Sequence, residues 1–245
     1  MKVGEIFEES ITVLKTNKMR TGLSVLGIII GIGSVIALMT LGQASQQSVK
    51  ERIQSLGSNL LTISPGASES GFLRGGPDEA KTLTYEDALD IENSERITTI
   101  ENVAASYSTR SQISSGENNM NVSVIGITSK YFNLRSIEVD YGSEINQNDI
   151  DNLLKVAVIG PGVVEEIFPN NPNPVGQNIR INGNSFTVVG ITKSKGSGMM
   201  GSDDSVFIPL TTAQKILFGV SHVSNIYVSA KNEELMDDAM NQLGF

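Results

Sequence analysis

Few residues in this chain have the types and spacing that catalysis or metal binding requires. The 245-residue sequence holds one histidine and no cysteine. His222 therefore has no thiolate partner for a zinc site or a nucleophilic pair, and we interpret it as a structural or surface residue near the start of a strand. The acidic pairs Asp203–Asp204 and Asp237–Asp238 indicate a loop and a solvated helix face. A glycosidase-type pair of carboxylates stays open here, because it depends on distances in space.

Two glycine-rich stretches match phosphate-binding loops only in part. Neither "GPGVV" nor "GSGMMG" ends in Gly-Lys-Ser/Thr or carries the full dinucleotide fingerprint after a strand. The sequence therefore predicts no nucleotide site, no metal site and no cofactor. The second stretch, which includes Gly196, Met199, Met200 and Gly201, is a candidate partner-contact loop, because thioether side chains adapt to irregular surfaces. Plain flexibility is the alternative interpretation of this loop.

The charge of the chain is distributed unevenly. The formal net charge is −9. Residues 1–20 carry four Lys/Arg and three Asp/Glu, which leaves fourteen and twenty-four of the totals of 18 and 27 for the remainder. Binding to a phosphate backbone needs a basic face, so nucleic acid is excluded as a partner of the larger part. The absence of cysteine neither requires nor excludes an oxidising compartment.

Residues 21–44 predict a transmembrane helix. Residues 23–41 carry no charged side chain, and at about 1.5 Å per residue they nearly cross a hydrocarbon core of about 30 Å. A signal peptide is the rival interpretation, since Gly42 and Ala44 resemble a small-x-small cleavage site. The apolar region of a signal peptide is shorter, about 7–15 residues, so we expect the helix to stay in the mature protein. The basic residues before it place the amino terminus in the cytoplasm and residues 45–245 outside.

Small residues recur along one face of this span. Ser24, Gly27, Gly31 and Ser34 follow one another at steps of three and four residues, which brings them together on a helix. In lipid, small residues let a second helix approach closely. We therefore predict a helix-packing face at these four residues. The alternative is that they have no packing role, since Gly is common in membrane helices.

Helical patterns continue on both sides of the span. Residues 1–20 predict an amphipathic helix on the cytoplasmic interface, because apolar residues recur there at near-helical spacing: Val3, Ile6, Phe7, Ile11 and Leu14. Residues 45–56 extend the membrane helix into water, and Gly57 is placed to end it in the left-handed conformation. Residues 65–81 are rich in Gly, Ser and Pro and predict a mobile loop.

Beyond this loop, short strands and short helices intermix, which predicts the α+β fold class. Thr84 is a predicted N-cap, and residues 97–114 and 119–128 form a predicted hairpin. The Asn182–Gly183 pair between apolar runs predicts a tight turn between two strands. Further predicted elements are the helices "SKYFNLR", "PGVVEEIF", "TTAQKIL" and "NEELMDDAMNQL" and the strands "LLTIS", "KVAVIG", "SVFIPL" and "VSNIYVSA".

Taken in order, six stretches of the sequence resemble the MacB-type (FtsX-like) permeases of ABC transporters, and specifically their amino-terminal half. They are "NKMRTGLSVLGIIIGIGSVIALMTLG" at 17–42, "LGSNLLTISPG" at 56–66, "VIGITSKYFNLR" at 124–135, "VAVIGPGVVEEIFP" at 156–169, "NPVGQNIRINGNSFTVVGI" at 173–191 and "VFIPLTTAQ" at 206–214. The resemblance covers nearly the whole chain. It implies the first transmembrane helix followed by a bilobed extracytoplasmic core domain.

The resemblance also implies how such a domain is divided and what it works with. A porter-like lobe would comprise about residues 57–135 and 205–245, and an inserted β-rich lobe about residues 136–204. A second permease copy, a cytoplasmic ABC ATPase and an adaptor protein are the implied partners. Members of the family relay ATP-driven motion to their outer domains for export or transenvelope signalling, and ATP is hydrolysed by the ATPase. Because members have four membrane helices, we expect this chain to be a truncated or trimmed permease.

Two other functions stay open at this point. A hydrolase, secreted or membrane-anchored, would need a convergent polar cleft. A single-pass binding or scaffold protein of the cell surface would end at Phe245. Three further apolar spans in the downstream DNA would favour the permease. No residue in the sequence identifies the cargo, the accessory proteins or the number of membranes around the cell.

Overall fold

The computed structural model divides into two compact units, Met1–Gln54 and Ser55–Phe245. Its described residues are Gly4, Thr12, 16–55, 59–65, 82–195 and 202–244, with the backbone alone for 47–55. Three of the predicted features therefore lie wholly or largely outside the described residues: the amphipathic helix of residues 1–20, Gly57 and the loop of residues 65–81.

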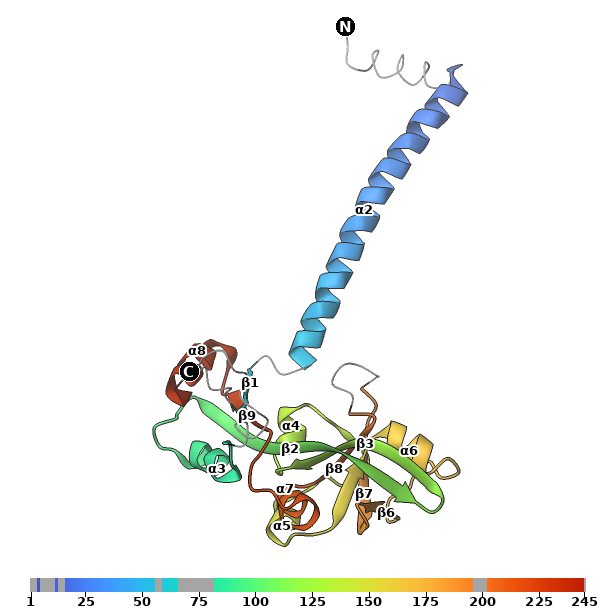
Figure 1. The fold of residues 1–245 in the computed structure, drawn as a ribbon. Helices are drawn as coiled ribbons and strands as arrows, with labels where there is room; N and C mark the ends of the chain where they lie inside the picture. Colours follow the sequence, from blue (N-terminus) through green and yellow to red (C-terminus); the bar gives the residue numbers. More distant parts are fainter. Residues whose placement is uncertain are drawn as a thin grey trace, which may run out of the picture. The chain divides into compact units, whose positions relative to one another are not determined.

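The described part of the first unit is dominated by one long helix. α2 (Lys18–Ser55) runs unbroken for 38 residues (Figure 1). Its 29-residue portion Lys18–Gln46 is long and apolar enough to cross a membrane, and it is the one such helix among the described residues. The predicted membrane helix and its predicted extension beyond Ala44 are thus a single element.

The second unit is built on a mixed sheet that has nine strands among the described residues. These are β1 (Leu60–Ile63), β2 (Ile100–Ser115), β3 (Asn118–Ile127), β4 (Val139–Gly142), β5 (Val156–Ile159), β6 (Asn178–Ile181), β7 (Asn184–Thr192), β8 (Ser205–Pro209) and β9 (Asn225–Ala230). The helices are α3 (Tyr85–Asn93), α4 (Tyr131–Leu134), α5 (Gln147–Asp151), α6 (Pro161–Ile167), α7 (Leu210–Thr212), the π-helix η1 (Ala213–Phe218), the 3₁₀ helix η2 (Glu233–Leu235) and α8 (Met236–Leu243). The predicted α+β fold class is confirmed.

Six of these strands close into a ring. β2, β3, β8, β5 and β7 pair in succession, and β6 connects β7 back to β2 through Ile113 opposite Ile181. The β3–β8 and β5–β7 pairs are parallel, and the other pairs of the ring are antiparallel. One hydrophobic cluster takes side chains from all six strands and from α6, and it includes the fully buried Phe186. The ring therefore has a core of its own.

The same sheet continues outside the ring through β9 and β1. β9 pairs antiparallel with the first half of β2, and β1 pairs antiparallel with β9. One cluster packs α4 against this sheet, and another packs α3 against β2 and β9. Strands from both predicted lobe ranges share the sheet, since β2, β3 and β8 of the porter-like range form the ring together with β5, β6 and β7 of the inserted range (Figure 1). The division into two lobes stays a prediction.

Local sequence signals are confirmed where the chain caps or turns. Thr84 accepts a hydrogen bond from the backbone N–H of Asp87, whose carboxylate accepts one from the backbone N–H of Thr84 in return. Asn182 and Gly183 have φ values of 47° and 80°, as a tight hairpin turn requires. The predicted helix "TTAQKIL" is formed, but most of it is the π-helix η1. β4 and α5 were not predicted.

We expect residues 45–245, produced without the membrane span, to be a soluble protein that unfolds cooperatively. The reason is that the sheet and its three hydrophobic clusters lie wholly within Ser55–Phe245. Circular dichroism during thermal melting tests this. A shallow, noncooperative melt of a mostly disordered chain would contradict it.

We expect Gly160→Ala to destabilise the second unit by about 2–3 kcal/mol, because a Cβ at Gly160 would overlap the backbone carbonyl oxygens of Ser202 and Asp203. Gly162→Ala is the matched control two residues away. Its Cβ would mainly meet the Asp204 carboxylate, the end of a side chain that can rotate, so it should cost less than about 1 kcal/mol. Urea unfolding measures both variants, and equal costs would show that the carbonyl overlap does not matter.

Candidate functional site

The apolar side chains of α2 are exposed along the whole span. Leu23, Ile30 and Leu41 keep 67%, 61% and 70% of their surface accessible, and the other large apolar side chains between them are similar. No part of Lys18–Gln46 is buried against described residues of the chain. A surface of this kind is stable only when lipid or another protein covers it.

The predicted packing face of α2 is open in the structure. Ser24, Gly27, Gly31 and Ser34 all lie on the helix, and a Cβ added at either glycine would meet no atom within 4 Å. The Ser34 hydroxyl donates to the Gly31 carbonyl at 2.9 Å, so its polar group is satisfied inside the helix. This geometry leaves room for a second helix. The packing role itself stays a prediction.

The one histidine makes structural contacts. The ring of His222 meets the Tyr107 ring edge-on, with centroids 5.4 Å apart. The backbone of His222 forms a β-bridge with Thr84, and its carbonyl accepts a hydrogen bond from Gln214 Nε2 at 3.0 Å. These contacts hold the backbone around His222 in place. They agree with the structural or surface role that we expected for this residue from the sequence.

The two acidic pairs lie in different settings. The Asp203 carboxylate accepts hydrogen bonds from the Ser194 hydroxyl at 2.7 Å and from the backbone N–H of Lys195 at 3.1 Å. Asp237 and Asp238 are exposed in the first turn of α8, where the helix dipole favours acidic groups. In the described ranges no group of three His, Cys, Asp or Glu side chains is placed to hold a metal ion.

The glycine-rich "GPGVV" stretch forms the amino-terminal turn of α6, after β5, but other atoms fill this place. The backbone N–H groups of Gly162 and Val163 both donate to the carbonyl of Asp203, at 2.9 and 3.4 Å. The space beside Gly160 is occupied by backbone as well. These donors are therefore used inside the fold. The "GSGMMG" loop with Gly196, Met199, Met200 and Gly201 lies outside the described residues.

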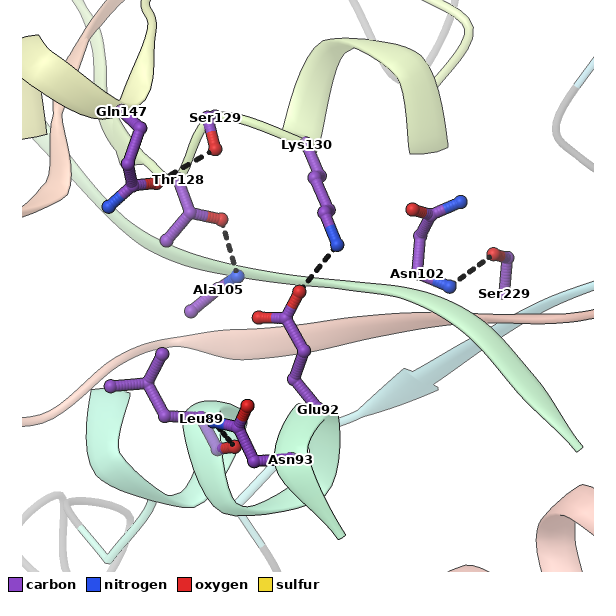
Figure 2. Close-up of polar contacts among 10 residues, drawn as sticks. All are labelled: Leu89, Glu92, Asn93, Asn102, Ala105, Thr128, Ser129, Lys130, Gln147 and Ser229. Carbon is purple, nitrogen blue, oxygen red and sulfur yellow. Dashed lines mark hydrogen bonds and ion pairs between the residues drawn. The ribbon is translucent and has the colours of Figure 1, made fainter. Parts of the chain in front are cut away.

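A polar network that sequence reasoning missed surrounds a cavity of about 320 Å³ between α3 and β2 (Figure 2). Lys130, just before α4, pairs with Glu92 at the end of α3. The Thr128 hydroxyl accepts from the backbone N–H of Ala105 at 3.1 Å, and the Ser129 hydroxyl donates to Gln147 at 3.0 Å. These contacts join segments that are far apart in the sequence, so no local sequence pattern predicts them.

This network positions the helices but supplies no reactive group. The Glu92 and Lys130 side chains are 35% and 43% exposed, so their pairing contributes about 0–1 kcal/mol. Burial is the main cause that raises the pKa of Tyr85, which lines the cavity and therefore stays neutral. We interpret the cavity as a structural feature of the joint between α3 and the sheet.

Comparison with known proteins agrees with the fold and the long helix. A model of the MacB-like periplasmic core domain matches residues 21–244. The macrolide export ATP-binding/permease protein MacB of Chlorobium luteolum is 34% identical over 224 residues, which are 91% of this chain and 33% of that protein. Its counterpart in Bdellovibrio bacteriovorus is 32% identical over 229 residues, which are 93% of this chain and 35% of that protein. The chain spans about a third of the length of these relatives.

Two crystal structures share the fold. The periplasmic region of MacB from Actinobacillus actinomycetemcomitans has a TM-score of 0.64 at 22% identity, covering 79% of this chain and 86% of that one. The extracellular domain of the noncanonic ABC-type transporter YknZ from Gram-positive bacteria has a TM-score of 0.61 at 19% identity, covering 74% and 88%. Since the family model spans the membrane helix and the sheet unit together, the chain belongs to the MacB-type ABC transporter permeases and carries a MacB-like periplasmic core domain.

Proposed function

We propose that the chain is part of a permease subunit that relays motion from a cytoplasmic ABC ATPase to an extracytoplasmic domain. The amino terminus lies in the cytoplasm, and residues 45–245 lie outside the membrane. ATP is hydrolysed by the ATPase partner. Lys18 and Arg20 before the apolar span support this orientation, because positive charge is retained on the cytoplasmic side.

The continuity of α2 is the observation that carries the proposal. At about 1.5 Å per residue, its 38 residues measure about 57 Å, whereas the hydrocarbon core is about 30 Å thick. One unbroken helix can therefore cross the membrane and continue beyond it as a stalk. An unbroken helix transmits a push or rotation along its axis, whereas a flexible linker would absorb it.

The partners follow from the helix and from the relatives. We propose that a second permease copy packs against Ser24, Gly27, Gly31 and Ser34, and that an adaptor protein contacts the outer domain, with the Gly196–Gly201 loop as a candidate contact. The relatives are named as macrolide exporters. Export or transenvelope mechanotransmission is the proposed role here, with the cargo open.

We expect the double variant Gly27→Ile and Gly31→Ile to weaken helix association in the membrane while leaving insertion intact. The added side chains fill the open face but keep the span apolar, and the loss should be about 1 kcal/mol. Crosslinking in membranes that contain the complete permease measures it.

The matched control is the double variant Gly22→Ile and Gly33→Ile, which adds the same bulk on the opposite side of α2, since about 100° separates successive residues. It should leave crosslinking unchanged. An equal loss of crosslinking in the two double variants would contradict the proposed packing face.

We expect Ser45→Pro to uncouple the ATPase from the outer domain. Proline inside a helix removes a backbone hydrogen bond and kinks the helix, at a cost of about 3 kcal/mol. Ser45 directly follows the predicted transmembrane segment of residues 21–44 and lies inside α2. ATPase stimulation and export by the complete transporter should fall together.

Ser45→Ala is the control for this substitution, because it keeps the helix and should keep activity. Surface delivery of both variants must be equal. If Ser45→Pro transports normally, α2 is only a tether, and a single-pass surface binding or scaffold protein becomes the better account.

A further inference from the structure

A second cavity of about 320 Å³ opens on one face of the sheet and is distinct from the one beside α3. We call it the serine cleft. Strands β9, β2, β3 and β8 form its floor, and the region of α4 forms one wall. Its lining comprises Ser106, Ser108, Ser123, Ile125, Tyr131, Arg135, Ile137, Ser202, Ser205, Phe207, Asn225 and Tyr227. Five of these residues are serines, one is an arginine and none is acidic.

The strand register explains why hydroxyl groups gather here. Residues directly opposite in neighbouring strands point to the same face. Ser106 lies opposite Asn225, and Ser123 lies opposite Ser205. Polar side chains of four strands are therefore brought together on the floor of one cavity.

The Ser106 hydroxyl faces the cleft. Ser106 is 2% exposed, and its hydroxyl makes no hydrogen bond to the described residues, although it lines the cleft. The hydroxyl oxygen still reaches the open space of the cleft, since it is not among the fully buried polar atoms without a partner. A molecule seated in the cleft would satisfy it.

The wall of the cleft supplies aromatic faces and a positive charge. The rings of Tyr131 and Tyr227 meet edge-on, with centroids 5.5 Å apart. The Arg135 guanidinium carbon lies 5.0 Å from the centroid of the Tyr227 ring. Lys195 Nζ donates to the Arg135 carbonyl at 3.0 Å, which adds a second cation nearby. Burial is the main cause that raises the pKa of Tyr131, so its hydroxyl stays protonated.

We propose that the serine cleft binds a monosaccharide that carries a carboxylate or phosphate group. The guanidinium fork of Arg135 matches a carboxylate or phosphate, the serine hydroxyls match sugar hydroxyls, and the tyrosine faces match the apolar face of a sugar ring. A volume of about 320 Å³ lies at the small end of the range of ligand pockets, about 300–1,000 Å³, and so suits a single sugar unit.

Isothermal titration of the full chain in lipid nanodiscs tests this with four probes: D-glucuronate, D-glucose 6-phosphate, D-glucose and inorganic phosphate. We expect D-glucuronate or D-glucose 6-phosphate to bind with a Kd of about 1 mM or tighter, and the other two to bind about tenfold more weakly. The preferred acid distinguishes a carboxylate ligand from a phosphate ligand. Equal binding of D-glucose, equal binding of inorganic phosphate, or no binding at all would each overturn the proposal.

Variants place the binding in the cleft. Ser106→Ala and Ser123→Ala should each raise the Kd for the preferred sugar acid about fivefold. Arg135→Gln should raise this Kd about tenfold, so that the sugar acid binds no more tightly than D-glucose. Ser111→Ala is the matched control, because Ser111 is buried on the same strand with its side chain on the opposite face. Thermal melting tests whether each variant folds. The binding result counts for the site only if at least one cleft variant melts at the same temperature as the unchanged protein. Loss of binding in Ser111→Ala, or full binding in a folded Ser106→Ala, would contradict the site.

Discussion

The exposed apolar surface of α2 is the constraint on which the organisation of this chain depends. Twelve large apolar side chains between Leu23 and Leu41 are exposed. Full burial of such a side chain is worth about 1.5–3 kcal/mol, so even partial burial of the set is on the order of 10 kcal/mol. That is comparable to the whole stability of a domain. The helix must therefore be covered, and its uncharged, hydrogen-bonded backbone suits a bilayer.

In the second unit, the first strand after α2 pairs directly into the sheet. α2 ends at Ser55 and β1 begins at Leu60. β1 pairs with β9, β9 pairs with β2, and the 16-residue β2 continues into the closed ring. In the proposed mechanism, a displacement delivered to β1 reaches the ring through backbone hydrogen bonds. No flexible side-chain contact is needed along this route.

Local features could be predicted from the sequence, and features that depend on distant pairing could not. The caps and turns at Thr84, Pro161 and Asn182–Gly183 follow from residue type: the Thr84 hydroxyl caps a helix, Pro161 suits the first helical position, and Asn182–Gly183 tolerate positive φ. Ring closure depends on Ile113 meeting Ile181, which are 68 positions apart (181 − 113) and carry no signal except that both are apolar. The serine cleft was missed for the same reason, since its residues come from four strands, the region of α4 and the segment before β8. The small-residue face of α2 could be predicted because it belongs to one helix.

The topology of the chain in a membrane tests the central claim most directly. The sequence contains no cysteine, so single cysteines introduced as Asn17→Cys and Glu117→Cys report two exposed positions without background. A membrane-impermeant maleimide is applied to right-side-out membrane vesicles, before and after detergent. We expect Glu117→Cys to be labelled in intact vesicles and Asn17→Cys to be labelled only after detergent. Labelling of Asn17→Cys in intact vesicles, or release of the Glu117→Cys protein into the soluble fraction, would contradict it.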